Sequence, residues 1–237
     1  MMRLDKYLCE TGFGTRTQVK TLVKKGLVTV NGTRAKKPEQ KVDETKDQVL
    51  CGGKEAAYAP YVYLMLHKPA GVVSARSDSR ERTVLDLIPP ESRRNLSPVG
   101  RLDKDTEGLL LLTDDGDLAH CLLSPGKHVD KTYYAKVAGK ITERHAEEFL
   151  KGLEIGEKSL TLPARLEIQK SGEVSEVLVT IHEGKFHQVK RMFAAVGCQV
   201  QYLKRLSMGT LVLDEKLEKG GFRPLTGEEI RSLKELV

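Results

Sequence analysis

The chain has 237 residues, enough to bury a sizeable core in one large or two smaller domains, and a formal net charge of +6 at pH 7. It contains no run of about eighteen apolar residues, no secretory leader and no lipidation signal, so we expect a soluble, cytoplasmic protein that does not enter a membrane. Its four cysteines, Cys9, Cys51, Cys121 and Cys198, are scattered without a CxxC pair, which argues against a zinc site and against a disulfide framework.

Residues 1–52 have the pattern of a small α/β module. Apolar residues at helical spacing begin at Leu4, and a capping-box pattern at Thr15 opens a second helix that closes at Gly26. The segment LVTVNGTRA then alternates like a β-hairpin around Asn31–Gly32, which is a strong two-residue turn signal.

Nearly all of the excess positive charge lies in this part of the chain. Residues 1–60 contain 12 Lys and Arg against 7 Asp and Glu, whereas the remaining residues are nearly neutral. A basic module attached to a neutral body indicates a partner that is a polyanion, with nucleic acid as the first candidate. The alternative is an ordinary solvated basic face.

The second part of the chain begins after a segment with the composition of a linker, GGKEAAYAP at 52–60. We place the domains at 1–55 and 61–237, with 56–60 as the linker. We expect strands at 61–66, 108–113, 131–138, 164–169, 175–182, 199–206 and 210–213, and helices at 141–151, 186–196 and 226–236. Many strands without regular βα alternation predict an α+β fold with a mixed, largely antiparallel sheet.

An acidic turn directly precedes the most apolar of these strands. Asp103 lies just before Leu109–Leu112, a run that predicts a strand buried on both faces. A carboxylate on a loop leading into such a strand is held rigidly and could act as a nucleophile or base. The alternative is that Asp103 and its acidic neighbours are solvated turn residues.

Four segments in order resemble one enzyme family. They are LHKPAGVVS at 66–74, GRLDKDTEGLLLLTDDG at 100–116, KTYYAKV at 131–137 and EGKFHQVKRMFAAVG at 183–197. Together they resemble the pseudouridine synthases of the ribosomal small-subunit type (the RsuA group). The resemblance implies a catalytic domain with a long mixed sheet crossed by a binding cleft, and a reaction without cofactor or metal.

The N-terminal module resembles the alpha-L RNA-binding domain, which is shared with a ribosomal small-subunit protein. By that resemblance, five basic residues would line the phosphate-facing helical surface: Arg3, Arg16, Lys20, Lys24 and Lys25. Such contacts position RNA without reading its bases.

The reaction breaks the bond between ribose carbon 1′ and uracil nitrogen, turns the base over and joins carbon 1′ to uracil carbon 5. A carboxylate could attack carbon 1′, add to the uracil ring or promote elimination toward a glycal, and the sequence leaves these three routes open. The resemblance implies that Asp103 is this carboxylate.

The resemblance assigns further roles around Asp103. Lys190 pairs with it, with Arg191 as the second candidate and a substrate-binding residue, while Tyr133 stacks on the uracil. Arg101 would help to turn the uridine out of its RNA stack, and Leu203 would contact the base. Without the resemblance, the helical pattern favours Lys190 as a surface residue of its helix, and a structural role is the usual one for a tyrosine such as Tyr133.

The segment HQVKRM at 187–192 is similar to the small-subunit enzymes, whereas relatives acting on large-subunit RNA carry an NRxxRR-like stretch there. We therefore predict a monomeric enzyme that isomerises one uridine of 16S ribosomal RNA, presented in a small-subunit assembly intermediate. The alternatives are a synthase acting on 23S rRNA and a non-catalytic RNA-binding ribosome-assembly factor. The pattern of His182, Glu183 and His187 does not have zinc-protease spacing.

Overall fold

The computed structural model describes residues 1–237 except 45, 57–60, 93–94 and 237. The chain forms two compact units, Met1–Pro60 and Tyr61–Val237, and each is described here by itself. No helix among the described residues is long and apolar enough to span a membrane.

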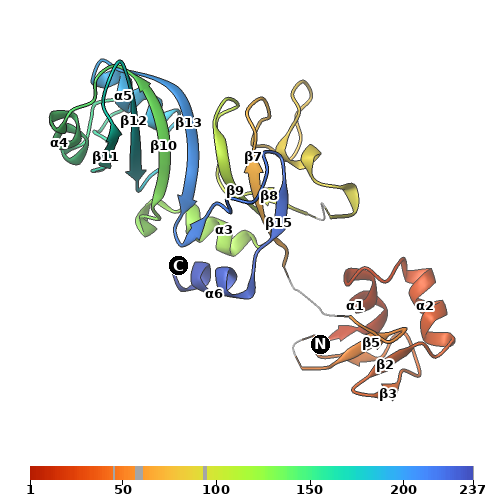
Figure 1. Ribbon diagram of the computed structural model, residues 1–237. Coiled ribbons are helices and arrows are strands. Elements are labelled where there is room, and N and C mark those ends of the chain that lie inside the picture. Colours follow the sequence, from red (N-terminus) through yellow and green to blue (C-terminus); the bar gives the residue numbers. More distant parts are fainter. Residues whose placement is uncertain (45, 57–60, 93–94, 237) are drawn as a thin grey trace. The chain divides into compact units, whose positions relative to one another are not determined.

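The first unit packs two short helices on small sheets (Figure 1). Its capping box is formed as predicted: the Gln18 amide donates to Thr15 Oγ1 at 3.4 Å, and the Thr15 amide donates to Gln18 Oε1 at 2.8 Å. The hairpin around Asn31–Gly32 is also confirmed. The elements are β1 Met2–Arg3, α1 Leu4–Glu10, α2 Arg16–Lys24, β2 Val28–Val30, β3 Thr33–Arg34, β4 Lys41–Val42, β5 Val49–Cys51 and β6 Lys54–Glu55.

The segment 52–60 is not a linker along its whole length. Gly52 and Gly53, both with positive φ, form the turn between β5 and β6, because glycine adopts this conformation without steric cost. Ala56 is buried in the core of the first unit, and its carbonyl accepts a hydrogen bond from the Tyr7 hydroxyl. The rest of the expected linker, 57–60, lies outside the described residues.

The second unit is built on one sheet, which has nine strands among the described residues, in the order β11-β12-β10-β13-β9-β7-β15 with β14 beside β13 and β8 beside β9. Among the named strands of the described residues, only the β9–β13 pairing is parallel. This confirms the α+β class. The strands are β7 Tyr63–Lys68, β8 Ser97–Pro98, β9 Glu107–Thr113, β10 Lys131–Ala138, β11 Arg165–Lys170, β12 Val174–Ile181, β13 Gln199–Met208, β14 Leu211–Val212 and β15 Phe222–Pro224.

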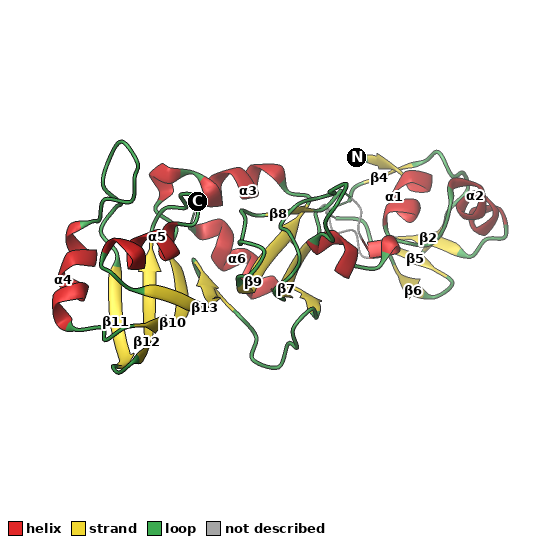
Figure 2. Cartoon of the chain, turned by 90° about the horizontal axis from the view of Figure 1, so that it is seen from above, coloured by secondary structure: helices red, strands yellow, loops and turns green. Residues whose placement is uncertain are grey.

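Four helices of the described second unit cover the sheet: α3 Gly116–Leu123, α4 Glu143–Lys151, α5 Gln188–Ala195 and α6 Gly227–Glu235. Figures 1 and 2 show α3 and α6 together, and Leu118, Leu122 and Leu233 of these helices share one apolar cluster. Three short 3-10 turns lie at Val84–Leu87, Pro90–Ser92 and Pro125–Lys127.

The sequence predictions contain no helix at 116–123, because acidic residues directly after a strand are also typical of a turn. Asp115 instead caps the helix, since its carboxylate accepts from the Leu118 amide at 3.0 Å. The expected strand at 61–66 is also shifted, because it begins at Tyr63 and continues to Lys68.

Strand β9 is buried on both faces, as predicted. Leu110 and Leu112 belong to one apolar cluster, while Leu109 and Leu111 belong to another on the opposite face. At its start, Gly108 has φ +108°, and a Cβ there would lie 2.2 Å from the Arg205 carbonyl oxygen. Only glycine therefore lets β9 approach β13 this closely.

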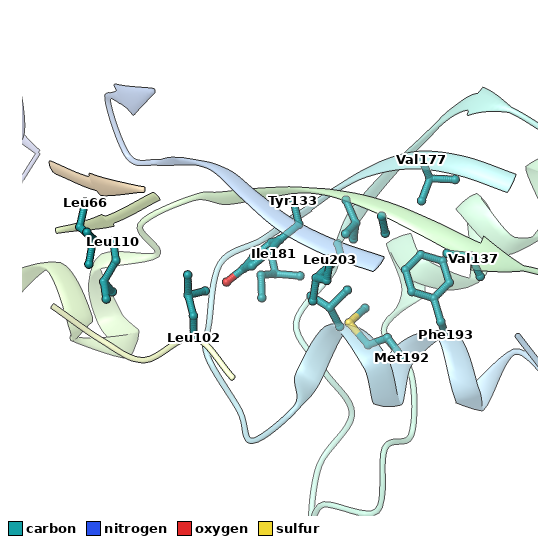
Figure 3. Packing of buried hydrophobic residues seen from close by; sticks show 14 of the residues in the cluster. Leu66, Leu102, Leu110, Tyr133, Val137, Val177, Ile181, Met192, Phe193 and Leu203 are labelled. Carbon is teal, nitrogen blue, oxygen red and sulfur yellow. The ribbon is translucent and has the colours of Figure 1, made fainter. Parts of the chain in front are cut away.

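Figure 3 shows the core beside this junction. Tyr133 of β10 and Leu203 of β13 point from the sheet toward the same side as Ile181, above Met192 and Phe193 of α5. The apolar face of α5 is thereby anchored to the sheet, and its polar residues are carried toward the loop before β9.

Candidate active site

The loop that carries Asp103 is fixed by backbone contacts on both sides of that residue. The Ser74 hydroxyl donates to the Leu102 carbonyl at 2.9 Å and accepts from the Leu102 amide at 3.1 Å. The Thr106 amide donates to the Asp103 carbonyl at 3.1 Å. Buried Leu102 anchors the loop in the core, so the Asp103 carboxylate is presented from a rigid backbone.

A buried lysine reinforces the same loop. Lys68, at the end of β7, is fully buried, and its ammonium donates to the carbonyls of Pro69, Asp103, Lys104 and Thr106 at 3.1, 3.0, 3.3 and 2.8 Å. Burial lowers the pKa of Lys68 to about 8, although nearby acidic residues, Asp105 foremost, oppose that shift. Lys68 is therefore a positioning residue for the Asp103 loop.

We expect Lys68→Met to destabilise the protein by about 2–3 kcal/mol, because buried carbonyls lose their donor. Since folding lowers the pKa of Lys68 from 10.5 to about 8, the unfolded chain binds more protons between these values. The stability advantage of the wild type over Lys68→Met should thus grow as pH rises from about 8 to about 10.5.

Chemical denaturation of the two proteins across that pH range measures the loss of stability and its dependence on pH. An advantage that shrinks with rising pH would contradict the assignment.

Lys190 of α5 faces the Asp103 carboxylate. Its Nζ lies 3.0 Å from Asp103 Oδ2 and 2.6 Å from Asp105 Oδ1. Burial alone would lower the pKa of Lys190, but the hydrogen bonds to Asp105 and Asp103 outweigh it and the pKa is raised. The hydrogen bond from Lys190 correspondingly lowers the pKa of Asp105. The structure thus brings the predicted pair together and adds Asp105 to it.

His187 and Phe186 lie at the mouth of the site, on the turn before α5. His187 has left-handed backbone geometry, and its Nε2 is 3.5 Å from Asp103 Oδ1. Its ring stacks on Phe186 with centroids 3.8 Å apart. Phe186 is 68% exposed. An exposed aromatic ring near the Asp103 carboxylate is a surface on which a nucleobase could stack.

A pocket of about 890 Å³ is lined by Asp103, Phe186 and His187, and also by Arg101 and Tyr133. A smaller pocket of about 70 Å³ shares Asp103 and Tyr133 and is further lined by Lys190 and Leu203. The structure therefore brings together Asp103, Tyr133, Lys190, Arg101 and Leu203. Tyr133 and Leu203 are buried, whereas Arg101 is exposed at the rim.

Arg191 does not join this group. Its guanidinium donates to Glu157 Oε1 at 2.9 Å and to the carbonyls of Phe186 and Ile155, so it points away from Asp103. Neighbouring residues of a helix face different directions, which is why only one of Lys190 and Arg191 can reach the loop.

The five basic residues predicted to bind RNA in the first unit also differ in their contacts: within the described part of the chain, four are exposed without an ion pair and one is paired. Arg16, Lys20 and Lys24 recur every four residues and form one exposed stripe on α2, followed by exposed Lys25. Arg3 is instead bound to Asp5, with Nη2 2.7 Å from Asp5 Oδ2. Four of the five predicted residues are therefore unpaired among the described residues.

Further residues of the site were not predicted from the sequence: Lys68, Asp105, Phe186 and His187. Lys68 directly follows the mainly apolar segment YLMLH, which predicts a buried strand. A lysine at the end of a buried strand needs hydrogen-bond partners, because lysines are rarely buried without them, and this could have indicated its role. The aromatic pair lacked any local signal, since its role depends on the neighbouring loop. Among the described residues, no group of His, Cys, Asp and Glu could hold a metal ion.

Comparison with known proteins is consistent with this geometry. Residues 62–195 match the family model of RNA pseudouridylate synthase, and residues 2–49 match that of the S4 domain. The chain is 48% identical to an uncharacterized RNA pseudouridine synthase of Bacillus subtilis, over 99% of both chains. It is 45% identical to ribosomal small subunit pseudouridine synthase A of Vibrio cholerae, covering 98% of this chain and 99% of that protein. A crystal structure of a pseudouridylate synthase matches with a TM-score of 0.69 and 38% identity, covering 98% of this chain and all of that one.

Proposed function

The chain belongs to the RNA pseudouridylate synthase family and carries an N-terminal S4 domain, and from that premise we propose that it isomerises one uridine of 16S rRNA to pseudouridine. The reaction uses the Asp103 carboxylate and needs no cofactor. The observation that carries this proposal is the position of Asp103, on a braced loop in a pocket, 3.0 Å from the Lys190 ammonium.

Each pocket residue has a role in this proposal. Lys190 contacts the Asp103 carboxylate at 3.0 Å and holds it in position to react with the sugar or the base. Tyr133 supplies a ring face for the uracil and a hydroxyl for proton transfer. Leu203 contacts the base from the small pocket shared with Tyr133.

A uridine in folded RNA must leave its stack to enter the pocket. Exposed Arg101 at the rim is suited to bind the displaced strand or fill its place, and Phe186 can stack on a neighbouring base. We therefore assign both residues to RNA binding rather than to the chemical step.

Small-subunit RNA is the proposed substrate because several relatives at 39–45% identity are named ribosomal small subunit pseudouridine synthase A. We propose that the enzyme acts as a cytoplasmic monomer on a partly assembled small subunit, where ribosomal proteins have shaped the RNA. The S4 domain supports RNA as the substrate, because its helix α2 carries an exposed stripe of basic residues.

Mapping pseudouridines in rRNA from cells that lack the protein tests the substrate. We expect one pseudouridine to disappear from 16S rRNA, with 23S rRNA unchanged. Loss from 23S rRNA alone would support the large-subunit alternative. Release of tritium from uracil carbon 5 in labelled RNA separates an enzyme from a non-catalytic assembly factor.

The stripe on α2 predicts a salt-dependent contribution to RNA binding. Replacing Arg16, Lys20, Lys24 and Lys25 with Gln should flatten the slope of log affinity against log salt by up to about 3, because fewer counterions are released. A matched control replaces Lys36, Lys37, Lys41 and Lys46, which are exposed elsewhere in the first unit. A slope for the stripe variant that is unchanged from the wild type would mean that the stripe does not contact RNA.

A further inference from the structure

Two buried cations of the large pocket take no part in the chemistry assigned above. Lys131 of β10 is 8% exposed and Arg205 of β13 is 2% exposed, and both line the pocket of about 890 Å³ that contains Asp103. Burial of a charge without a partner is costly, so such groups are usually paired or serve a ligand.

The strand register places both cations beside Tyr133, the residue proposed to stack on the uracil. Tyr133 pairs with Arg205 across β10 and β13, and directly opposed residues lie on the same face of a sheet. Lys131 precedes Tyr133 by two residues and therefore shares that face too. A nucleotide whose base contacts Tyr133 would thus have these two cations within its surroundings.

Neither cation has a carboxylate partner among the described residues. Lys131 Nζ donates to the Val129 carbonyl at 2.7 Å, and Arg205 Nε donates to the Leu109 carbonyl at 2.8 Å. Arg205 Nη2 is buried without a hydrogen-bond partner. Burial foremost, and then the charge of Arg205, lower the pKa of Lys131 to about 8, against the opposing effect of the Asp130 charge.

The nearby acidic residues are already engaged. Asp130 is half-exposed and its Oδ1 lies 2.7 Å from His182 Nδ1, while Asp103 faces Lys190 and His187. Lys131 and Arg205 therefore have no ion-pair partner among the described residues, although both line the wall of a pocket large enough for a whole nucleotide.

We propose that Lys131 and Arg205 form an anion subsite that binds an RNA phosphodiester next to the flipped uridine. This inference rests on the proposed RNA substrate. The phosphate supplies the missing negative charge, and the unpartnered arginine nitrogen gains an acceptor once the guanidinium turns toward it. The target nucleotide is then fixed at two points, its base against Tyr133 and its backbone at the two cations.

Calorimetric titration of the full-length protein with uridine, uridine 5′-monophosphate, uridine 3′-monophosphate and inorganic phosphate tests the subsite. At least one monophosphate should bind about tenfold more tightly than uridine, which corresponds to about 1.4 kcal/mol. Inorganic phosphate should compete with that monophosphate. Equal binding of uridine and both monophosphates by the wild type would overturn the proposal.

Two variants locate the effect. Lys131→Met should bring the monophosphate and uridine affinities within about twofold of each other, whereas Lys136→Met, on the opposite and exposed face of β10, should keep the difference. A preserved difference in a folded Lys131→Met protein would overturn the subsite. Arg205→Lys is a second test, because it keeps the positive charge but loses the planar guanidinium that can form two hydrogen bonds to a phosphate. It should weaken monophosphate binding more than uridine binding. Absence of pseudouridine formation by the wild type would count against the proposed function alone, because the titrations do not depend on turnover.

Discussion

Replacing Asp103 with Asn should abolish pseudouridine formation while RNA affinity stays within a few-fold of wild type. Asn keeps the shape and hydrogen-bonding reach of Asp but cannot act as a nucleophile or base. The loop around it is fixed through the Leu102 and Asp103 backbone, which this change leaves intact. Phosphate contacts elsewhere supply most of the binding energy.

The measurement is single-turnover conversion of an RNA carrying the mapped uridine, with filter binding of the same RNA in parallel. Asp105→Asn is the matched control, because Asp105 also contacts Lys190 but is largely exposed. It should retain activity within a few-fold. Turnover by purified Asp103→Asn would remove Asp103 from the mechanism, and an inactive Asp105→Asn would shift the role to Asp105.

Replacing Lys190 with Met should lower the rate of the chemical step by about 100-fold, which corresponds to about 2.7 kcal/mol. The Asp103 side chain is 26% exposed, so it is only partly solvated and depends on the cation 3.0 Å away. The raised pKa of Lys190 means that it remains charged at pH values where an ordinary lysine begins to lose its proton. Wild-type activity should therefore not decline through deprotonation of Lys190 below about pH 10.

Lys190→Arg tests whether the rate depends on the positive charge, because arginine keeps that charge. This variant should have a much higher rate than Lys190→Met. Arg191→Gln serves as the neighbouring control, because Arg191 contacts Glu157 and the Ile155 carbonyl rather than Asp103. Its chemical step should stay near the wild-type rate. An equal loss in Lys190→Met and Arg191→Gln would indicate that α5 is merely displaced in both.

Local signals in the sequence were enough for most secondary structure. The Thr15 capping box, the Asn31–Gly32 hairpin and the apolar run of β9 each depend on residues within one turn or one strand. Helix α3 was missed for the same reason, because an Asp that caps a helix and an Asp that closes a strand have similar neighbours. The N-terminal excess of basic residues was likewise visible as composition alone.

The sequence by itself determined the α+β class, the family resemblance and Asp103 as the candidate carboxylate, because each follows from the order of short segments along the chain. Only the tertiary structure decided which cation faces that carboxylate, since Lys190 and Arg191 are adjacent in sequence and diverge only on a formed helix. It also decided that Lys68 braces the loop and that Lys131 and Arg205 share a pocket without an acidic partner. These contacts join strands distant along the chain, and their strength depends on burial, which exists only once the sheet has packed.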